Sequence, residues 1–222
     1  MFSYCAMRGY CEMHGIELHT DPWWGERVFQ LEHPRCEGDL PRRDENTLCI
    51  GERNVSYRSY SQRQHCADYY SLRQIRQWFM FRPVICSLLP RPETTDTVVH
   101  FRRGDYAGSG YPVVSADSYL SATPFSIECV TEESPRTHKN FLGEFSFVPD
   151  FYFMANAHKL YRANSSFSFW AGCLAIANHS AQVYSPIITG KAGGQEHFCQ
   201  FQPDNWARIA ELDCVEQITI KP

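Results

Sequence analysis

Strand-like and helix-like segments alternate from residue 97 onward, and this order limits the possible folds more than any other feature. The segment TVVHF at 97–101 is apolar and β-branched, which is typical of a strand. Further strands are expected at 126–130, 143–148, 160–163 and 182–185, with helices after Ser115, at 150–158 and at 165–178. This alternation predicts an α/β protein with a parallel, doubly wound sheet that binds ligands beyond the carboxyl ends of its strands.

The first part of the chain is less regular. Its expected elements are a helix over 2–14 that ends at Gly15, a strand over 16–20, loops over 33–58 and a helix over 69–81. Prolines at three positions then punctuate 83–95. Because proline interrupts regular structure, we place an inter-domain boundary in this stretch, which gives two domains, 1–93 and 94–222.

The charge of the chain argues against a nucleic-acid partner. Lys and Arg total 21 against 25 Asp and Glu, so the formal net charge is −4 and the pI is near 6.1. Binding by phosphate neutralisation needs an excess of positive charge. No apolar run approaches the roughly 20 residues that span a bilayer, and the first residues lack the features of an export signal. We expect a cytoplasmic protein, free or peripheral to a membrane, with no integral membrane span and an oligomeric state that the sequence leaves open.

The cysteines and histidines do not form a metal-binding or disulfide pattern. The ten cysteines are spread almost evenly, with no Cys-x-x-Cys pair, which predicts reduced thiols that are mostly buried. The nine histidines lack the paired spacing of zinc ligands, and no Asp-x-Asp pair occurs. The sequence therefore predicts no metal and no other cofactor.

The segment with the most informative chemistry is 100–106, HFRRGDY, where the first of these strands runs into a loop. Neighbouring side chains at a strand end point in different directions, so either Arg102 or Arg103 can face the crevice while the other pairs with a carboxylate such as Asp105. A guanidinium held in this way can clamp a phosphate or a pyrophosphate. The residues leave a second interpretation open, in which both arginines are solvated charges and His100 is a satisfied strand residue.

A second segment, 163–172, has the sequence ANSSFSFWAG, with hydroxyls at the expected start of a helix. Backbone N–H groups at a helix start form an anion site. By itself the segment also fits a plain N-cap followed by a buried aromatic helix. Both segments fall at carboxyl ends of strands in one predicted sheet, so an arginine and a helix N-terminus can converge on one pyrophosphate.

These segments resemble motifs of the α-1,2-fucosyltransferase family. Segment 100–106 is similar to its HxRRGDY motif, and 164–172 is similar to its NSSFSWWGA segment, with Phe169 where the family usually has Trp. Segment 2–6, FSYCA, is similar to the residues that follow the family's N-terminal glycine-asparagine turn. The resemblance implies a GT-B fold of two Rossmann-like domains with parallel sheets. The acceptor-side domain, 1–93, would be reduced and lack its first strand, and 94–222 would bind GDP-fucose.

The resemblance also implies roles for individual residues. Arg103 would bind the β-phosphate of the donor and stabilise the departing GDP, while His100 and Asp105 would shape the same loop. The other residues that it places near the donor are Arg102, Gly104, Thr131, Glu132, Ser165, Ser166 and Phe167.

The implied activity is an inverting, metal-independent transfer of fucose from GDP-fucose to a hydroxyl of a glycan. Arginine and a helix dipole would stabilise the leaving group where other transferases use a divalent ion. The general base is not identified, and Glu17, Asp21 and Glu26 are candidates in the acceptor-side domain. Two alternatives stay open: a transferase that uses another nucleotide sugar, and an inactive protein that binds nucleotides or glycans.

Overall fold

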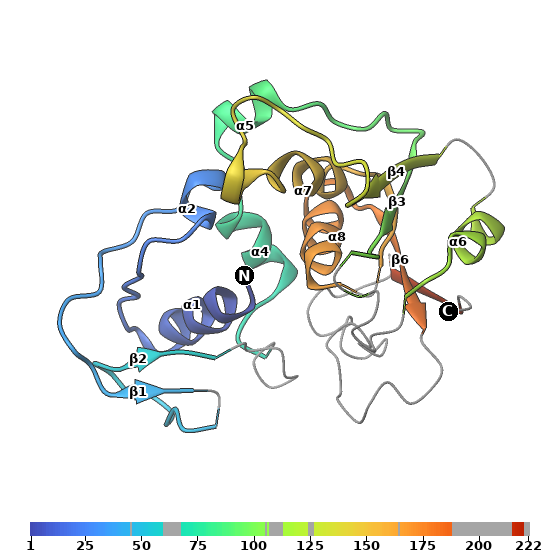
Figure 1. Cartoon of the computed structure of the whole chain (residues 1–222). Coiled ribbons are helices and arrows are strands. Elements are labelled where there is room, and N and C mark those ends of the chain that lie inside the picture. Colours follow the sequence, from blue (N-terminus) through green and yellow to red (C-terminus); the bar gives the residue numbers. More distant parts are fainter. Residues whose placement is uncertain are drawn as a thin grey trace. The chain divides into compact units, whose positions relative to one another are not determined.

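The computed structural model describes residues 1–44, 46–59, 68–104, 106, 113–123, 127–163 and 165–187, and the backbone of 215–219. The chain divides into two compact units, Met1–Arg82 and Pro83–Pro222. All strand pairs in its two described sheets are parallel, and helices accompany them in both units (Figure 1). The fold is therefore mixed α/β with parallel sheets. Among the described helices, none combines the length and the apolar composition that crossing a bilayer requires.

The first unit contains two well-defined helices. Helix α1 (Phe2–His14) ends at Gly15, whose left-handed backbone, with φ of 62°, suits a residue without a Cβ. Helix α4 (Leu72–Trp78) begins with a capping box, in which the Ser71 hydroxyl accepts from the Gln74 N–H and the Gln74 side chain accepts from the Ser71 N–H. The other described elements of this unit are α2 (Gly25–Val28) and a short parallel pair, β1 (Arg42–Arg43) with β2 (Ser56–Tyr57).

Two expectations for the first unit were wrong in detail. Segment 16–20 is not a strand: only Thr20 forms a bridge, to Arg35, and the segment has no neighbouring strand among the described residues. The helix expected over 69–81 is confined to 72–78, because Ser71 caps its start and Phe79 leaves helical geometry. Parallel pairing in this unit extends over two residues of each strand, so an extended parallel sheet is described only for the second unit.

The second unit holds the predicted parallel sheet, with the strand order β4-β3-β5-β6-β7. Its elements in chain order are α5 (Pro83–Leu88), β3 (Thr97–Phe101), α6 (Ala116–Ala122), β4 (Ile127–Thr131), the 3-10 helix η1 (Gly143–Phe145), α7 (Val148–Ala155), β5 (Lys159–Tyr161), α8 (Ser166–His179), β6 (Gln182–Ile187) and β7 (Val215–Thr219).

The strand order reverses between β3 and β5. The chain passes from β3 through α6 outward to β4, and then returns across the sheet to β5 on the other side of β3. Figure 1 shows α6 on one face of the sheet and α7 and α8 on the other. Doubly wound sheets bind ligands at such a reversal, because the two connections leave in opposite directions and open a crevice.

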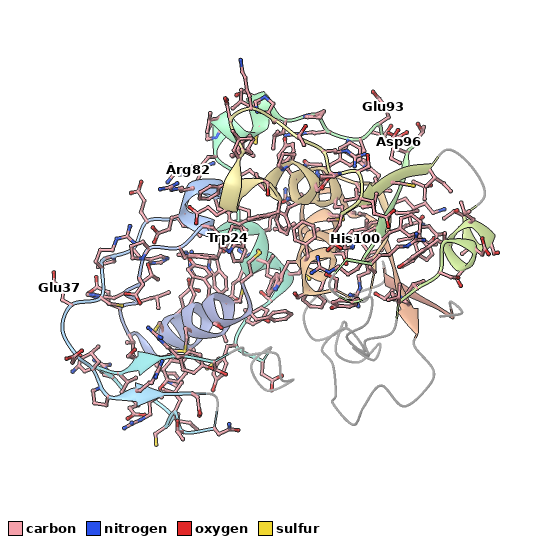
Figure 2. The ribbon with its side chains drawn as sticks, in the orientation of Figure 1. Trp24, Glu37, Arg82, Glu93, Asp96 and His100 are labelled. Carbon is pink, nitrogen blue, oxygen red and sulfur yellow. The ribbon has the colours of Figure 1, made fainter. Side chains whose placement is uncertain are left out.

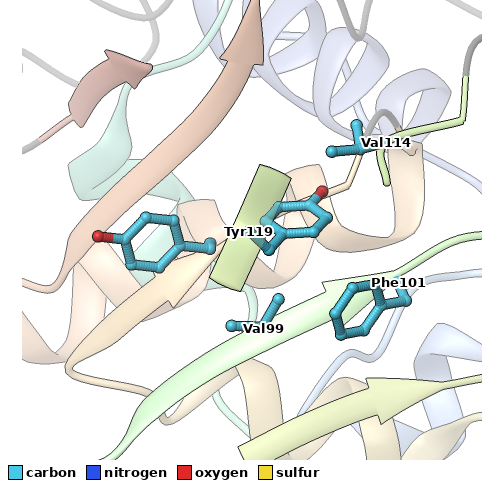
Figure 3. Close-up of a cluster of buried hydrophobic side chains, with 5 residues drawn as sticks. Val99, Phe101, Val114 and Tyr119 are labelled. Carbon is cyan, nitrogen blue, oxygen red and sulfur yellow. The ribbon is translucent and has the colours of Figure 1, made fainter. Parts of the chain in front are cut away.

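Packing on the two faces agrees with this arrangement. On one face, Val99 and Phe101 of β3 pack against Tyr119 of α6 (Figure 3). On the other face, α8 lies so close to the sheet that a Cβ on Gly172 would stand 3.1 Å from a methyl group of Val183. Glycine at this position thus allows the helix to approach the strands closely.

One expectation for the second unit is corrected, and two of its described elements were not expected. Segment 143–148 is not a strand, because Gly143 adopts φ of 58° and Pro149 lies in the first turn of α7. Residues 83–88, within the stretch where we expect the inter-domain boundary, form helix α5, with Pro83 at the first helical position, where its missing N–H costs nothing. Strand β7 was not expected from the sequence.

The described cysteines are unpaired by disulfides but are less buried than expected. Cys5, Cys11 and Cys173 are buried and Cys86 is partly exposed. The exposed ones are Cys36, Cys49 and Cys129. The expectation that most of the thiols are buried is therefore wrong for these positions.

Candidate functional site

The loop after β3 begins at the reversal of the strand order. Because side chains alternate along a strand, and Val99 and Phe101 face α6, His100 faces the side of α8. There its ring lies 5.7 Å, between centroids, from the ring of Phe167 in the first turn of α8. His100 is labelled in Figure 2 among the packed side chains of this unit. The two segments that the sequence singled out therefore meet in the fold.

His100 has an unusual environment for an ionisable group. It is 2% exposed, and its Nδ1 has no hydrogen-bond partner among the described residues. Burial, followed by the nearby charges of Arg102 and Arg162, lowers the pKa of His100 from 6.5 to about 3. The ring is therefore neutral near pH 7. A buried polar atom normally has a partner, so this nitrogen is a candidate contact for a ligand.

The two arginines of the loop contact different neighbours. Arg102 is two residues after His100, so the alternation along β3 places it on the same side as His100. Its Nη1 forms an ion pair with Oε1 of Glu132. Arg103 lies on the same side as Phe101, and its guanidinium carbon is 5.3 Å from the centre of the Phe101 ring. The carboxylate that pairs with Arg102 comes from the end of the neighbouring strand. Asp105, the partner suggested by the sequence, lies outside the described residues.

Gly104 joins the loop to the same carboxylate. Its backbone N–H donates to Oε2 of Glu132 over 2.5 Å. A Cβ at position 104 would overlap Oε2 of Glu132, so a larger residue there would require the Glu132 side chain to move away from the loop. Thr131, just before Glu132, turns toward its own loop, where its Oγ1 accepts from the N–H of Glu133 at 3.2 Å. Thr131 and Glu132 were both expected near the sugar donor. Of the two, Glu132 contacts the loop that carries Arg102, Arg103 and Gly104, which we call the arginine loop.

The N-terminus of α8 supplies the second part of the site. Ser165 is its N-cap, 3% exposed, and the hydroxyl accepts from the N–H of Phe167 at 3.2 Å. Ser166 and Phe167 form the start of a helix of 14 residues. A helix of this length presents a partial positive charge at its first turn. Asn164, which precedes it in the motif, lies outside the described residues.

Arg162 is a residue of this site that sequence reasoning missed. It follows β5, is 0% exposed, and donates from Nε to the hydroxyl of Ser185 on β6 at 2.6 Å. Its guanidinium carbon lies 5.6 Å from the ring centre of Phe169 on α8, and its carbonyl accepts from Tyr119 of α6 at 3.0 Å. A single arginine after an apolar strand was the only signal. Two of its partners, Ser185 and Tyr119, lie on elements that are distant in sequence.

The carboxylates proposed as bases lie in the first unit. Glu26 accepts from both terminal nitrogens of Arg35, at 2.7 and 2.8 Å, and these bonds lower its pKa. A carboxylate stabilised in its charged form is a weak base. Glu17 and Asp21 are exposed, and Glu17 contacts the Nε2 of His19. None of these contacts distinguishes a catalytic base.

Over the part of the chain that the structure describes, no three His, Cys, Asp or Glu side chains gather in a way that could hold a metal ion. Comparisons with family models, with curated proteins and with solved structures find no match to this chain. The fold and the site therefore define a mixed α/β protein. Its second unit has a parallel sheet with a candidate anion site at the reversal of strand order.

Proposed function

We propose that this protein is an inverting glycosyltransferase that moves fucose from GDP-fucose to a hydroxyl of a glycan, similar to the α-1,2-fucosyltransferases. The observation that carries the proposal is the meeting of His100, the arginine loop and the start of α8 at one point of the sheet. Guanidinium groups and helix N-termini both bind phosphate groups in proteins.

In the proposed reaction, the acceptor oxygen attacks C1 of fucose while the bond from C1 to the β-phosphate oxygen breaks. The electron pair of that bond goes to GDP, and the acceptor proton passes to a base. The negative charge that gathers on the β-phosphate is stabilised by the loop arginine and by the N–H groups at the start of α8. His100, which is neutral, can add a hydrogen bond from Nδ1 without needing to change its charge.

We assign the main phosphate contact to Arg102. Arg102 lies close enough to His100 to lower its pKa, and His100 contacts the first turn of α8. Arg103, which the resemblance singles out, lies against Phe101 on the opposite face of β3. Arg103 is therefore the second candidate for the same role.

The proposal extends to the whole chain. We propose a GT-B arrangement in which the C-terminal unit binds the donor and the N-terminal unit faces the acceptor, acting in the cytoplasm without a metal ion. The positive charge that a metal would supply comes from the arginine and the helix dipole. Turnover should therefore persist when EDTA is added.

The test is a transfer assay with purified protein, GDP-fucose and a panel of soluble glycans, with GDP release and fucosylated product both measured. We expect Arg102→Ala to lower the rate by about 10²–10³, the effect of removing a charged contact to a leaving group. Arg103→Ala should lower it less. Arg76→Ala, on the exposed side of α4, is the matched control.

Absence of product with every acceptor would refute the proposal, as would full activity of both loop variants. Faster turnover with another nucleotide sugar would replace GDP-fucose with that donor. Loss of turnover in EDTA that Mg²⁺ or Mn²⁺ restores would refute the metal-independent mechanism.

A further inference from the structure

We infer that Glu132 is an internal occupant of the anion site, and that a diphosphate ligand binds by displacing its carboxylate. The inference rests on the proposed function only for the identity of the natural ligand. It concerns how the site is regulated before a ligand arrives.

The contacts of Glu132 are those expected of a bound anion. One carboxylate oxygen pairs with the guanidinium of Arg102, and the other accepts from the backbone N–H of Gly104. A guanidinium together with a glycine N–H in a loop is a donor set that binds phosphate oxygens. Glu132 thus engages the two donors of the arginine loop that a phosphate would use.

The carboxylate has a path out of this position. The side chain of Glu132 is 32% exposed and that of Arg102 is 27% exposed. Ion pairs at such partly exposed positions are weak, because water competes for both partners. A diphosphate carries more negative charge than one carboxylate, so it can take over Arg102 and Gly104 while Glu132 turns into solvent.

A different role for Glu132 would have the opposite consequence. If the carboxylate only held the loop in the shape that the ligand needs, removing its charge would weaken ligand binding. If it occupies the site, removing its charge frees Arg102 and strengthens binding. The sign of the change in affinity therefore separates a competitor from a positioning residue.

The experiment is a calorimetric titration of inorganic pyrophosphate, and separately of GDP, into the full chain and into Glu132→Gln. Glutamine keeps the size of the side chain and removes its charge. We expect E132Q to bind pyrophosphate about fivefold more tightly than the unaltered chain does. Glu144→Gln, the same change at an exposed position of η1, should shift the affinity less than twofold.

A second measurement follows the Gly104 amide by NMR. We expect its hydrogen exchange to be faster in E132Q than in the unaltered chain, and its resonance to shift when pyrophosphate binds. If E132Q does not fold, Glu132→Asp provides the same comparison, because its shorter side chain reaches Gly104 less well.

Equal or weaker pyrophosphate binding by E132Q would overturn the inference, and so would failure of both proteins to bind. These outcomes are separate from a failure of the proposed function. A chain that binds pyrophosphate more tightly as E132Q but transfers no fucose would refute the transferase proposal and support the role of Glu132.

Discussion

Acidification should destabilise this protein through His100. The imidazole is buried and its pKa is lowered from 6.5 to about 3, first by desolvation and then by Arg102 and Arg162. The unfolded chain binds a proton near pH 6.5, whereas the folded chain does not until much lower pH. The unfolded state is therefore favoured as the pH falls from 6.5 toward 3.

The size of the effect follows from the two pKa values. At pH 5 the unfolded imidazole is almost fully protonated and the folded one is almost fully neutral. With 1.36 kcal/mol for each unit of pKa difference that is titrated, this histidine removes about 2 kcal/mol of stability between pH 7.5 and pH 5. That is a large share of the 5–15 kcal/mol typical of folded proteins, as a rough guide.

The assay is urea unfolding followed by circular dichroism at pH 7.5, 6.5 and 5, for the unaltered chain and for His100→Asn. Asparagine cannot take up the proton. Between pH 7.5 and pH 5 the free energy of unfolding of H100N should therefore fall by about 2 kcal/mol less than that of the unaltered chain. His19→Gln is the control, because His19 is exposed and its contacts with Glu17 and the Arg35 carbonyl raise its pKa. The reasoning is refuted if the chain and H100N lose stability in parallel, or if NMR shows His100 titrating near pH 6.5.

Two further substitutions test the construction of the site, and a labelling experiment tests the burial of the thiols. Ser165→Ala removes the buried N-cap of α8 and should lower the free energy of unfolding by about 1 kcal/mol. Ser166→Ala removes no cap and should lower it by less than half as much. Equal losses in the two variants would contradict the cap assignment. Arg162→Lys keeps the charge but loses the guanidinium contacts to Ser185 and Phe169, so it should lower the free energy of urea unfolding by about 2 kcal/mol. An unchanged midpoint of the urea unfolding curve would show that these contacts are dispensable. Maleimide labelling, read out by mass spectrometry, should modify the exposed thiols of the native chain, Cys36, Cys49 and Cys129. Cys11 and Cys173 should react only after unfolding, because burial shields both thiols and raises their pKa. Labelling of Cys173 in the native chain would contradict the packing of α8.

The central strands and α8 were predictable because their signals are local. Segment 97–101 is rich in β-branched and apolar residues, as expected of a strand that is buried at every position, and Ser165 precedes an apolar run in the way that an N-cap does. Segment 143–148 misled because Phe145 and Phe147 alternate like strand residues. Gly143 and Pro149 outweigh that pattern, the first through its positive φ and the second through its place in a helix start.

The candidate site was predictable in its location but not in all of its contacts. Two motifs at strand ends of one sheet predicted that the arginine loop and the start of α8 meet, and His100 and Phe167 do. The choice of Arg102 over Arg103 as the phosphate contact depends on the alternation of side chains along β3, which places Arg102 on the same side as His100. The role of Arg162 depends on Ser185 and Tyr119, which only the folded sheet brings to it.

The most direct test of the central claim is a calorimetric titration of GDP into the full chain and into Arg102→Ala. We expect saturable binding at one site, weakened at least tenfold in R102A, as expected for loss of a charged hydrogen bond of about 1.5–3 kcal/mol. Arg76→Ala should bind GDP as the unaltered chain does. Absence of saturable GDP binding, or equally tight binding by R102A, would show that the phosphate site is not built as proposed.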